Sequence, residues 1–221
     1  KATMTEVLEN SINTGSVFAE QKTGHEIFYQ YLMKFGFNEL TRINLPGEVK
    51  SNIRNLVKGR DIHYATASFG QGISVTPIAL INAFSAVAND GVLMKPLILK
   101  DEKPQVIRRV ISLETSKKLI QMMISTVKKN KVADIANYSV AGKSGTAYIP
   151  NFKSGGYTDE VINTFIGFAP ASSPKFVVLI KLDKPASAPF ATVAVGPAFW
   201  DLTQFILNYY NIPPDKLVDS Q

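Results

Sequence analysis

The sequence predicts an α+β fold, in which helices come first and an antiparallel sheet follows. Apolar residues recur at helical spacing within residues 3–35 and 113–129. Farther along, segments rich in β-branched and aromatic residues predict strands at 138–148, 162–169 and 176–182. We therefore treat residues 1–221 as one domain with a mainly helical part, 1–135, and a sheet part that ends in a helix, 136–221.

The first predicted helices are interrupted near Ser11-Ile12-Asn13. A further helix is expected from Glu26 to Lys34, and it should end near Gly36, because glycine readily adopts the left-handed conformation that closes a helix. Residues 36–63 contain Pro, Gly and several Asn, so we predict mostly loop with short helices there.

A helix is predicted to begin at Thr76-Pro77, since threonine is a good N-cap and proline is favoured at the first helical position. Its apolar residues spread nearly all round the helix, so we expect it to be buried. It should end at Asn89-Asp90-Gly91, where glycine again provides the cap. In residues 92–111, short extended pieces alternate with a polar turn.

The strand at 176–182 is apolar on both faces, as a central strand would be. At an edge it would expose unpaired backbone groups, so we expect a missing segment, another chain or a rearranged element to cover it. Pro197 then begins the last helix, in which Phe199, Leu202 and Ile206 recur at helical spacing.

The composition excludes several classes of function. The net charge is +6, but the lysines are dispersed, and nucleic-acid binding requires a basic stripe with base-reading or stacking groups. The absence of cysteine rules out disulfides and thiolate metal sites. His25 and His63 are far apart in the sequence, which argues against a histidine metal cluster or a Ser-His-Asp triad. We therefore predict no metal, no cofactor and no nucleic-acid partner.

Residues 140–148 contain the strongest candidate for chemistry, the run Lys143-Ser144-Gly145-Thr146. On a strand, Lys143 and Gly145 share one face while Ser144 and Thr146 share the other. Glycine inside a strand is costly unless something approaches the backbone closely. The free N–H groups of an edge strand bind a peptide alongside or stabilise an oxyanion. The alternative is a strand with a solvated lysine and a glycine bulge.

Ser11-Ile12-Asn13 and Lys143-Ser144-Gly145 resemble two of the three signatures of penicillin-binding proteins and serine β-lactamases. Other segments similar to the family's passages are Phe35-Gly36-Phe37, Leu45-Pro46-Gly47-Glu48, Ser68-Phe69-Gly70-Gln71-Gly72, Val75-Thr76-Pro77, Ala88-Asn89-Asp90-Gly91 and Phe165-Ile166-Gly167-Phe168-Ala169-Pro170. Because the resemblance covers nearly the whole chain, the chain is identified as the C-terminal part of the transpeptidase domain of a class B penicillin-binding protein. The resemblance implies the family's antiparallel sheet with a helical subdomain, incomplete here on the N-terminal side.

The resemblance implies a peptidoglycan D,D-transpeptidase, in which a serine attacks the penultimate D-alanine carbonyl of a cell-wall stem peptide. Ser11 would relay a proton towards the leaving amine, and Asn13 would hydrogen-bond the acyl-side amide. Lys143 would hold that relay and the substrate carboxylate electrostatically. In the substrate-binding strand, Ser144 would hydrogen-bond the carboxylate, and Gly145-Thr146 would supply the Thr146 N–H to the oxyanion hole. The alternative for Ser11 and Asn13 is a pair of helix-capping residues.

The nucleophile is missing from the place where the family has it. Its Ser-x-x-Lys motif precedes Ser-x-Asn, yet none of the ten residues before Ser11 is serine. Ser125-Thr126-Val127-Lys128 and Ser172-Ser173-Pro174-Lys175 match the motif but come too late in the chain, and Pro174 disfavours the helical spacing that the motif needs. We therefore expect the nucleophile outside this chain and the chain alone to be inactive.

Two alternatives remain open: a β-lactamase or penicillin sensor of the same fold, and a non-catalytic scaffold module. The partners that the resemblance implies are peptidoglycan stem peptides, β-lactam antibiotics and cell-wall synthesis proteins. The processes that it implies are the determination of cell shape and cell division. Family members are anchored in the bacterial cell membrane and act on its extracytoplasmic face. No apolar run here approaches the roughly 18 residues of a membrane helix, and no signal peptide opens the chain. We therefore expect a fragment whose parent carries the anchor.

Overall fold

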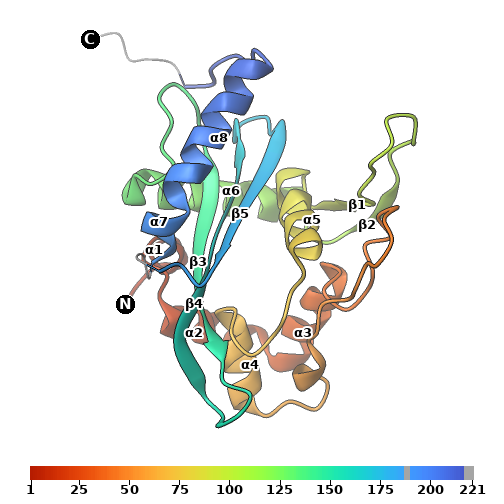
Figure 1. Cartoon of the computed structure of the whole chain (residues 1–221), viewed down its shortest axis with the longest axis vertical. Coiled ribbons are helices and arrows are strands. Elements are labelled where there is room, and N and C mark those ends of the chain that lie inside the picture. Colours follow the sequence, from red (N-terminus) through yellow and green to blue (C-terminus); the bar gives the residue numbers. More distant parts are fainter. Residues whose placement is uncertain (187–189, 217–221) are drawn as a thin grey trace. The chain divides into compact units, whose positions relative to one another are not determined.

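The computed structural model describes residues 1–186 and 190–216 and confirms the predicted α+β class (Figure 1). The chain divides into two compact units. The first consists of residues 1–7 and 11–119, and the second of residues 8–10 together with the chain from Ile120 onward. These units are defined by packing, whereas the parts 1–135 and 136–221 follow the order of helices and strands along the sequence.

Helices make up most of the first unit, and the predicted helical stretch is confirmed together with its break. In chain order they are α1 (Met4–Glu9), whose last residues belong to the second unit, α2 (Asn13–Thr23), α3 (His25–Lys34), the 3-10 helix η1 (Arg54–Leu56), α4 (Asp61–Ser68) and α5 (Pro77–Ala88). The prediction missed most of α4, because turn residues precede it. Its stability comes from burial of Tyr64 and Ala67 against Ile53 and Leu56.

The loop between α3 and η1 is closed by Glu48. Its carboxylate accepts hydrogen bonds from the N–H and the hydroxyl of Thr41, both at 2.6 Å, and from the N–H of Arg42 at 3.1 Å. Gly47, just before it, has a φ of +79°, which glycine adopts without strain. The turn thus explains the glycine and the glutamate of the Leu-Pro-Gly-Glu passage.

Helix α5 begins and ends as predicted. The Thr76 hydroxyl accepts a hydrogen bond from the Ala79 N–H at 3.3 Å. Beyond the helix, Gly91 has a φ of +81°, and its N–H donates to the Ala86 carbonyl at 2.8 Å. The buried residues of α5 are mainly alanines, so the expected burial on nearly all sides holds only in part. The strands β1 (Val92–Met94) and β2 (Val106–Arg109) then pair antiparallel.

A buried carboxylate in the first unit depends on one histidine. The Glu20 side chain is 1% exposed, and its Oε1 lies 2.6 Å from His25 Nδ1. The His25 ring stacks on Tyr64 with 4.1 Å between the ring centroids, and its Nε2 lies 3.2 Å from the exposed Asp61 carboxylate. The hydrogen bond to Glu20 raises the pKa of His25 above its ordinary value. This cluster joins α2, α3 and α4.

Replacing His25 by alanine is expected to lower the free energy of unfolding by about 1–3 kcal/mol, because Glu20 would stay buried without its hydrogen bond. Since the pKa of His25 is raised on folding, the stabilisation is fully present below the unfolded pKa of about 6.5 and is lost as the pH rises through the folded pKa. The difference in stability between acidic and alkaline buffer, measured by urea unfolding, should therefore be larger for the wild type than for His25→Ala.

The control for this histidine is Asp61→Asn. It changes a carboxylate that is 98% exposed, so its effect on stability should be small. Equal losses in His25→Ala and Asp61→Asn would show that the buried Glu20 is not what makes His25 important.

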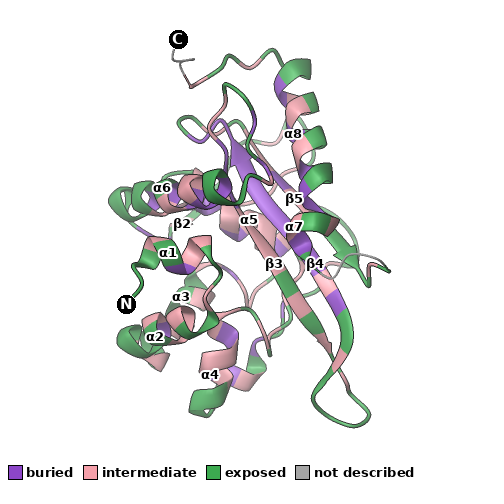
Figure 2. Cartoon of the chain, turned by 90° about the vertical axis from the view of Figure 1, so that its left-hand side faces the viewer, coloured by how far each residue is buried: buried purple, intermediate pink, exposed green. Residues whose placement is uncertain are grey.

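The second unit contains the predicted antiparallel sheet, in the order β3 (Ala141–Pro150), β4 (Tyr157–Ala169) and β5 (Phe176–Asp183). β4 is central, and the half of it that ends at Ala169 is buried (Figure 2). β5 is an edge strand among the described residues, and the expectation that a further segment or another chain covers it stays a prediction. One reason for its apolar residues is one-sided packing, since Val178 is buried in the core that includes Phe199 of the last helix.

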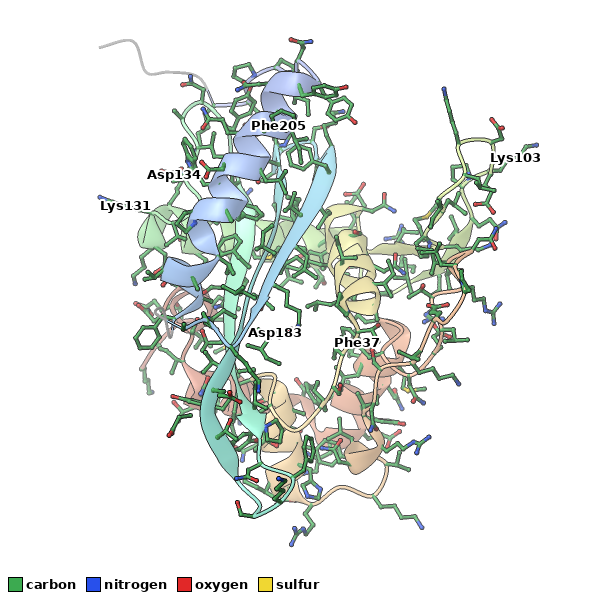
Figure 3. All side chains as sticks on the ribbon, viewed as in Figure 1. Phe37, Lys103, Lys131, Asp134, Asp183 and Phe205 are labelled. Carbon is green, nitrogen blue, oxygen red and sulfur yellow. The ribbon has the colours of Figure 1, made fainter. Side chains whose placement is uncertain are left out.

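Helices α7 (Ala191–Ala194) and α8 (Gly196–Tyr209) cover one face of this sheet (Figure 1). Phe199 of α8 packs against Phe165 of β4 with 4.5 Å between ring centroids, and Val127 of α6 (Leu113–Asn130) joins the same core. Asp134 lies beside α8 (Figure 3), and its carbonyl accepts a hydrogen bond from Trp200 Nε1 at 3.1 Å. Among the helices in residues 1–186 and 190–216, none has the length and hydropathy that crossing a membrane requires.

Candidate active site

The run Lys143-Ser144-Gly145-Thr146 lies on β3, which forms one edge of the sheet in the described part of the chain. Lys143 is opposite Ile166 and Gly145 is opposite Thr164 on β4. A Cβ on Gly145 would lie 2.7 Å from Thr164 Oγ1, so the neighbouring strand makes the close approach that requires glycine. β3 therefore presents a lysine and two hydroxyls on a strand that pairs with β4 on one side only.

The Lys143 ammonium is held close to its own strand. Its Nζ donates a hydrogen bond to the Ser144 carbonyl at 2.8 Å, and the residue is only partly exposed. Burial lowers the pKa of Lys143 below that of a solvated lysine. The alternative of a fully solvated lysine is therefore wrong. A partly desolvated ammonium attracts a carboxylate more strongly than an exposed one and loses its proton more readily.

Ser144 and Thr146 lie on the face of β3 that α7 covers. Ser144 lines a cavity of about 10 Å³ together with Phe165 and Thr192. The Thr146 hydroxyl accepts a hydrogen bond from the Ala191 N–H at 3.1 Å. Strand alternation thus places both hydroxyls on the opposite face from Lys143, as predicted. The bond to Ala191 was not predicted, because no turn or capping signal marks that residue.

Ser11 and Asn13 lie at the junction of α1 and α2. Ser11 has a positive φ of 49°, and Asn13 is the first residue of α2. The N-cap residue of α2 is Ile12, which makes no side-chain capping bond, so neither Ser11 nor Asn13 occupies the N-cap position of this helix. Both residues belong to the first unit, whereas Lys143 belongs to the second. That they form one site with Lys143 stays a prediction.

Neither Ser-x-x-Lys match has the surroundings of a nucleophile. A nucleophilic serine is activated by a base that takes its proton, such as a neutral lysine. The Ser125 hydroxyl instead donates to the Glu9 carboxylate, and the Ser172 hydroxyl donates to Asp215 Oδ2 at 2.6 Å. The lysine of each match is exposed. These contacts support the prediction that both matches are coincidental.

Comparisons with known proteins agree with these features. The family model described as "Penicillin binding protein transpeptidase domain" matches residues 1–203. "Penicillin-binding protein PbpB" of Mycolicibacterium smegmatis is 33% identical over 234 residues, which cover 96% of this chain and 36% of that protein. "Probable peptidoglycan D,D-transpeptidase PbpC" of Pseudomonas aeruginosa is 32% identical over 223 residues, which cover 99% of this chain and 39% of that protein. The chain therefore spans less than half the length of these relatives.

Solved structures share the fold. The apo transpeptidase domain of Burkholderia pseudomallei penicillin-binding protein 3 matches with a TM-score of 0.88 at 29% identity, over 97% of this chain and 66% of that chain. Penicillin-binding protein 3 from Mycobacterium tuberculosis, complexed with ampicillin, matches with a TM-score of 0.86 at 29% identity, over 98% of this chain and 53% of that chain.

Proposed function

Because the chain belongs to the penicillin-binding protein transpeptidase domain family, we propose that it forms part of a peptidoglycan D,D-transpeptidase, which cross-links the cell wall by serine acyl transfer. The family membership predicted from the sequence is confirmed. The observation that carries the proposal is the edge strand β3, which lies inside the matched region and holds the partly buried Lys143. The name of the Pseudomonas aeruginosa relative supports the same activity.

In the proposed reaction, a serine oxygen attacks the penultimate D-alanine carbonyl, and the C–N bond to the terminal D-alanine breaks. Ser11 relays the proton of the attacking serine to the leaving amine, and Asn13 hydrogen-bonds the acyl-side amide. An amine of a second stem peptide then attacks the acyl-serine ester. This step forms the new peptide bond and returns the proton to the serine.

Strand β3 has the binding role in this proposal. Lys143 holds the Ser11 relay and the terminal carboxylate electrostatically. Ser144, although it lies on the opposite face of β3, is proposed to hydrogen-bond that carboxylate. Gly145 belongs to this substrate-binding strand, where its missing side chain makes room for Thr164, and the Thr146 N–H forms half of the oxyanion hole. The role of Lys143 is supported by its lowered pKa and by the fixed position of its Nζ beside the Ser144 carbonyl.

The attacking serine is proposed to lie outside the printed sequence, so neither Ser125 nor Ser172 carries the acyl group. Peptide mapping of the parent protein after reaction with benzylpenicillin should therefore place the adduct on a serine other than these two. Ser172→Ala should leave labelling by a fluorescent penicillin unchanged, because its hydroxyl is engaged with Asp215. A penicilloyl group found on Ser125 or Ser172 would contradict this assignment.

The proposed ligands are peptidoglycan stem peptides and β-lactam antibiotics. The Mycobacterium tuberculosis relative in complex with ampicillin supports the second class. We place the parent protein at the extracytoplasmic face of the bacterial cell membrane, where its substrate lies, with a membrane anchor and other cell-wall synthesis proteins as partners.

One experiment separates this function from its alternatives. The complete transpeptidase domain is incubated with benzylpenicillin and followed by intact-mass spectrometry, and it is then given donor and acceptor stem peptides. A transpeptidase forms a long-lived adduct and a cross-linked peptide. A β-lactamase releases hydrolysed penicillin rapidly, a sensor forms the adduct without cross-linking, and a scaffold module forms no adduct. Each of these three outcomes would refute the proposed activity.

A further inference from the structure

Glu9, at the end of α1, is tied to α6 at three points. Its carboxylate accepts hydrogen bonds from the Ser125 hydroxyl and from Lys129 Nζ, the latter at 3.0 Å. Its backbone carbonyl accepts a third from Asn130 Nδ2 at 3.1 Å. Only 13% of the Glu9 side chain is exposed. The bonds from Ser125 and Lys129 hold the pKa of Glu9 below its ordinary value, so the carboxylate is ionised at neutral pH.

Ser11, just beyond this attachment, has a backbone conformation that is unfavourable for its residue type. Its φ of +49° lies in the left-handed region, where the Cβ of an L-residue is crowded. Such a conformation persists only where the surrounding structure imposes it, and it is concentrated at functional sites. The Ile12 N–H donates to the Val7 carbonyl at 3.0 Å across this turn, which closes the end of α1.

Val7 anchors the same turn on α2. Its side chain is 7% exposed. A Cβ on Gly15 would lie 2.4 Å from Val7 Cγ2, so α1 packs directly against the backbone of α2 at this glycine. The chain that leads into Ser11 is therefore fixed at two nearby points, by Val7 on α2 and by Glu9 on α6.

We propose that Glu9 is a positioning residue for Ser11: by fixing the end of α1 to α6, it keeps the Ser11 hydroxyl where the proton relay needs it. This inference rests on the proposed function, in which Ser11 carries the proton of the leaving group. Glu9 and Asn10 belong to the compact unit that also contains Lys143, and Ser11 follows them directly. Any shift of Glu9 on α6 is therefore passed to Ser11 through a single intervening residue.

The test uses the complete transpeptidase domain that contains this chain, with benzylpenicillin as the probe. In Glu9→Ala the acylation rate constant is expected to fall about 10- to 100-fold, because a displacement of about 1 Å has effects of this size. The dissociation constant of the non-covalent complex should change little, since Glu9 does not bind the ligand. Glu9→Gln keeps an acceptor for the Ser125 hydroxyl and should recover most of the rate.

Ser11→Ala is the background that identifies how Glu9 acts. If Glu9 works through Ser11, then Glu9→Ala causes no further loss when Ser11 is already alanine. If the double variant loses acylation rate by the product of the two single-variant factors, the proposal is overturned. The matched control is Glu114→Ala, because Glu114 is a carboxylate on the same helix α6 that pairs with Lys118 at 2.8 Å but is 78% exposed. Its removal should leave acylation unchanged.

Hydrogen exchange of the Ile12 amide provides a measurement that does not depend on activity. This amide donates to Val7 across the Ser11 turn, so its exchange should accelerate in Glu9→Ala and stay unchanged in Glu114→Ala. If the wild-type domain folds but is never acylated, the proposed function fails, while faster Ile12 exchange would still support the positioning of the turn. Unchanged exchange together with unchanged acylation would overturn the role of Glu9. Should Glu9→Ala not fold, Ser125→Ala takes its place, because it removes only one hydrogen-bond donor to Glu9. It should slow acylation and accelerate exchange of the Ile12 amide, both by a smaller factor.

Discussion

Replacing Lys143 by alanine in the complete transpeptidase domain is expected to lower the acylation rate constant for benzylpenicillin about 100- to 1,000-fold, the size of effect seen when one preorganised group that stabilises transition-state charge is removed. The Lys143 side chain is partly buried on the edge strand β3, and its Nζ is fixed by the Ser144 carbonyl at 2.8 Å. Because this ammonium is partly desolvated, it acts on nearby negative charge more strongly than a surface lysine does. Stopped-flow acylation measures the loss directly.

Two further variants show whether the position of the Lys143 charge matters. Lys181→Ala removes an exposed lysine from β5 in the same sheet, where it pairs with Asp183, and it should acylate normally. Lys143→Arg keeps a charge of different shape and should recover only part of the rate. Equal acylation rates for Lys143→Ala and the wild type would contradict the assignment.

The pH dependence of acylation offers an additional check on Lys143. Burial lowers the pKa of Lys143. The wild-type rate should therefore decline on the alkaline side at a pH below about 10.4, where an exposed lysine loses its proton. Lys143→Arg, whose guanidinium stays protonated, should not show this decline.

Gly91→Ala is expected to lower the free energy of unfolding by about 2–5 kcal/mol, more than any other variant proposed here. About 1–2 kcal/mol of this comes from placing alanine in a left-handed conformation, and about 1–3 kcal/mol comes from overpacking. Gly91 has a φ of +81°, and a Cβ there would lie 2.2 Å from the carbonyl oxygen of Ile111. Its own carbonyl accepts a hydrogen bond from the Val110 N–H at 2.8 Å, so the backbone cannot move away without losing that bond. Urea unfolding of the domain measures the change.

Gly47→Ala separates the two causes of the loss at Gly91. Gly47 has a similar φ of +79°, but nothing lies within 4 Å of a Cβ placed on it. Its replacement should therefore cost only the conformational part, about 1–2 kcal/mol. If Gly91→Ala and Gly47→Ala lower the free energy of unfolding equally, the close approach to Ile111 does not destabilise the variant and the expectation for Gly91 is wrong.

Much of the fold could be predicted because local physics determines it. Thr76-Pro77 begins α5 and Gly91 closes the turn after it, because capping and positive φ depend on a few neighbouring residues. The residue pattern located β3 and β5 to within three residues of their bounds and the end of β4 at Ala169, but β4 begins at Tyr157, five residues before its predicted start. The Lys143 run and its family could likewise be recognised from the order of residues alone.

Other features were decided by tertiary packing, since they depend on residues that are distant in the sequence. The helical state of α4 depends on burial of Tyr64 against Ile53 and Leu56, which its local turn signals obscure. β5 has the composition of a central strand, yet its place in the described sheet is set by which strands are present to pair with it.

By itself, the sequence determined the fold class, the family and the strand that carries Lys143. Only the tertiary structure showed that Glu9 accepts a hydrogen bond from Ser125, more than a hundred positions along the chain, and that the Thr146 hydroxyl is bonded by the Ala191 N–H. Helix caps, turns and periodicity involve residues that are near one another in the chain, so the sequence displays them. The partly buried Glu9 carboxylate, by contrast, is bonded by side chains that helix packing brings within hydrogen-bonding distance, and no short stretch of sequence contains that information.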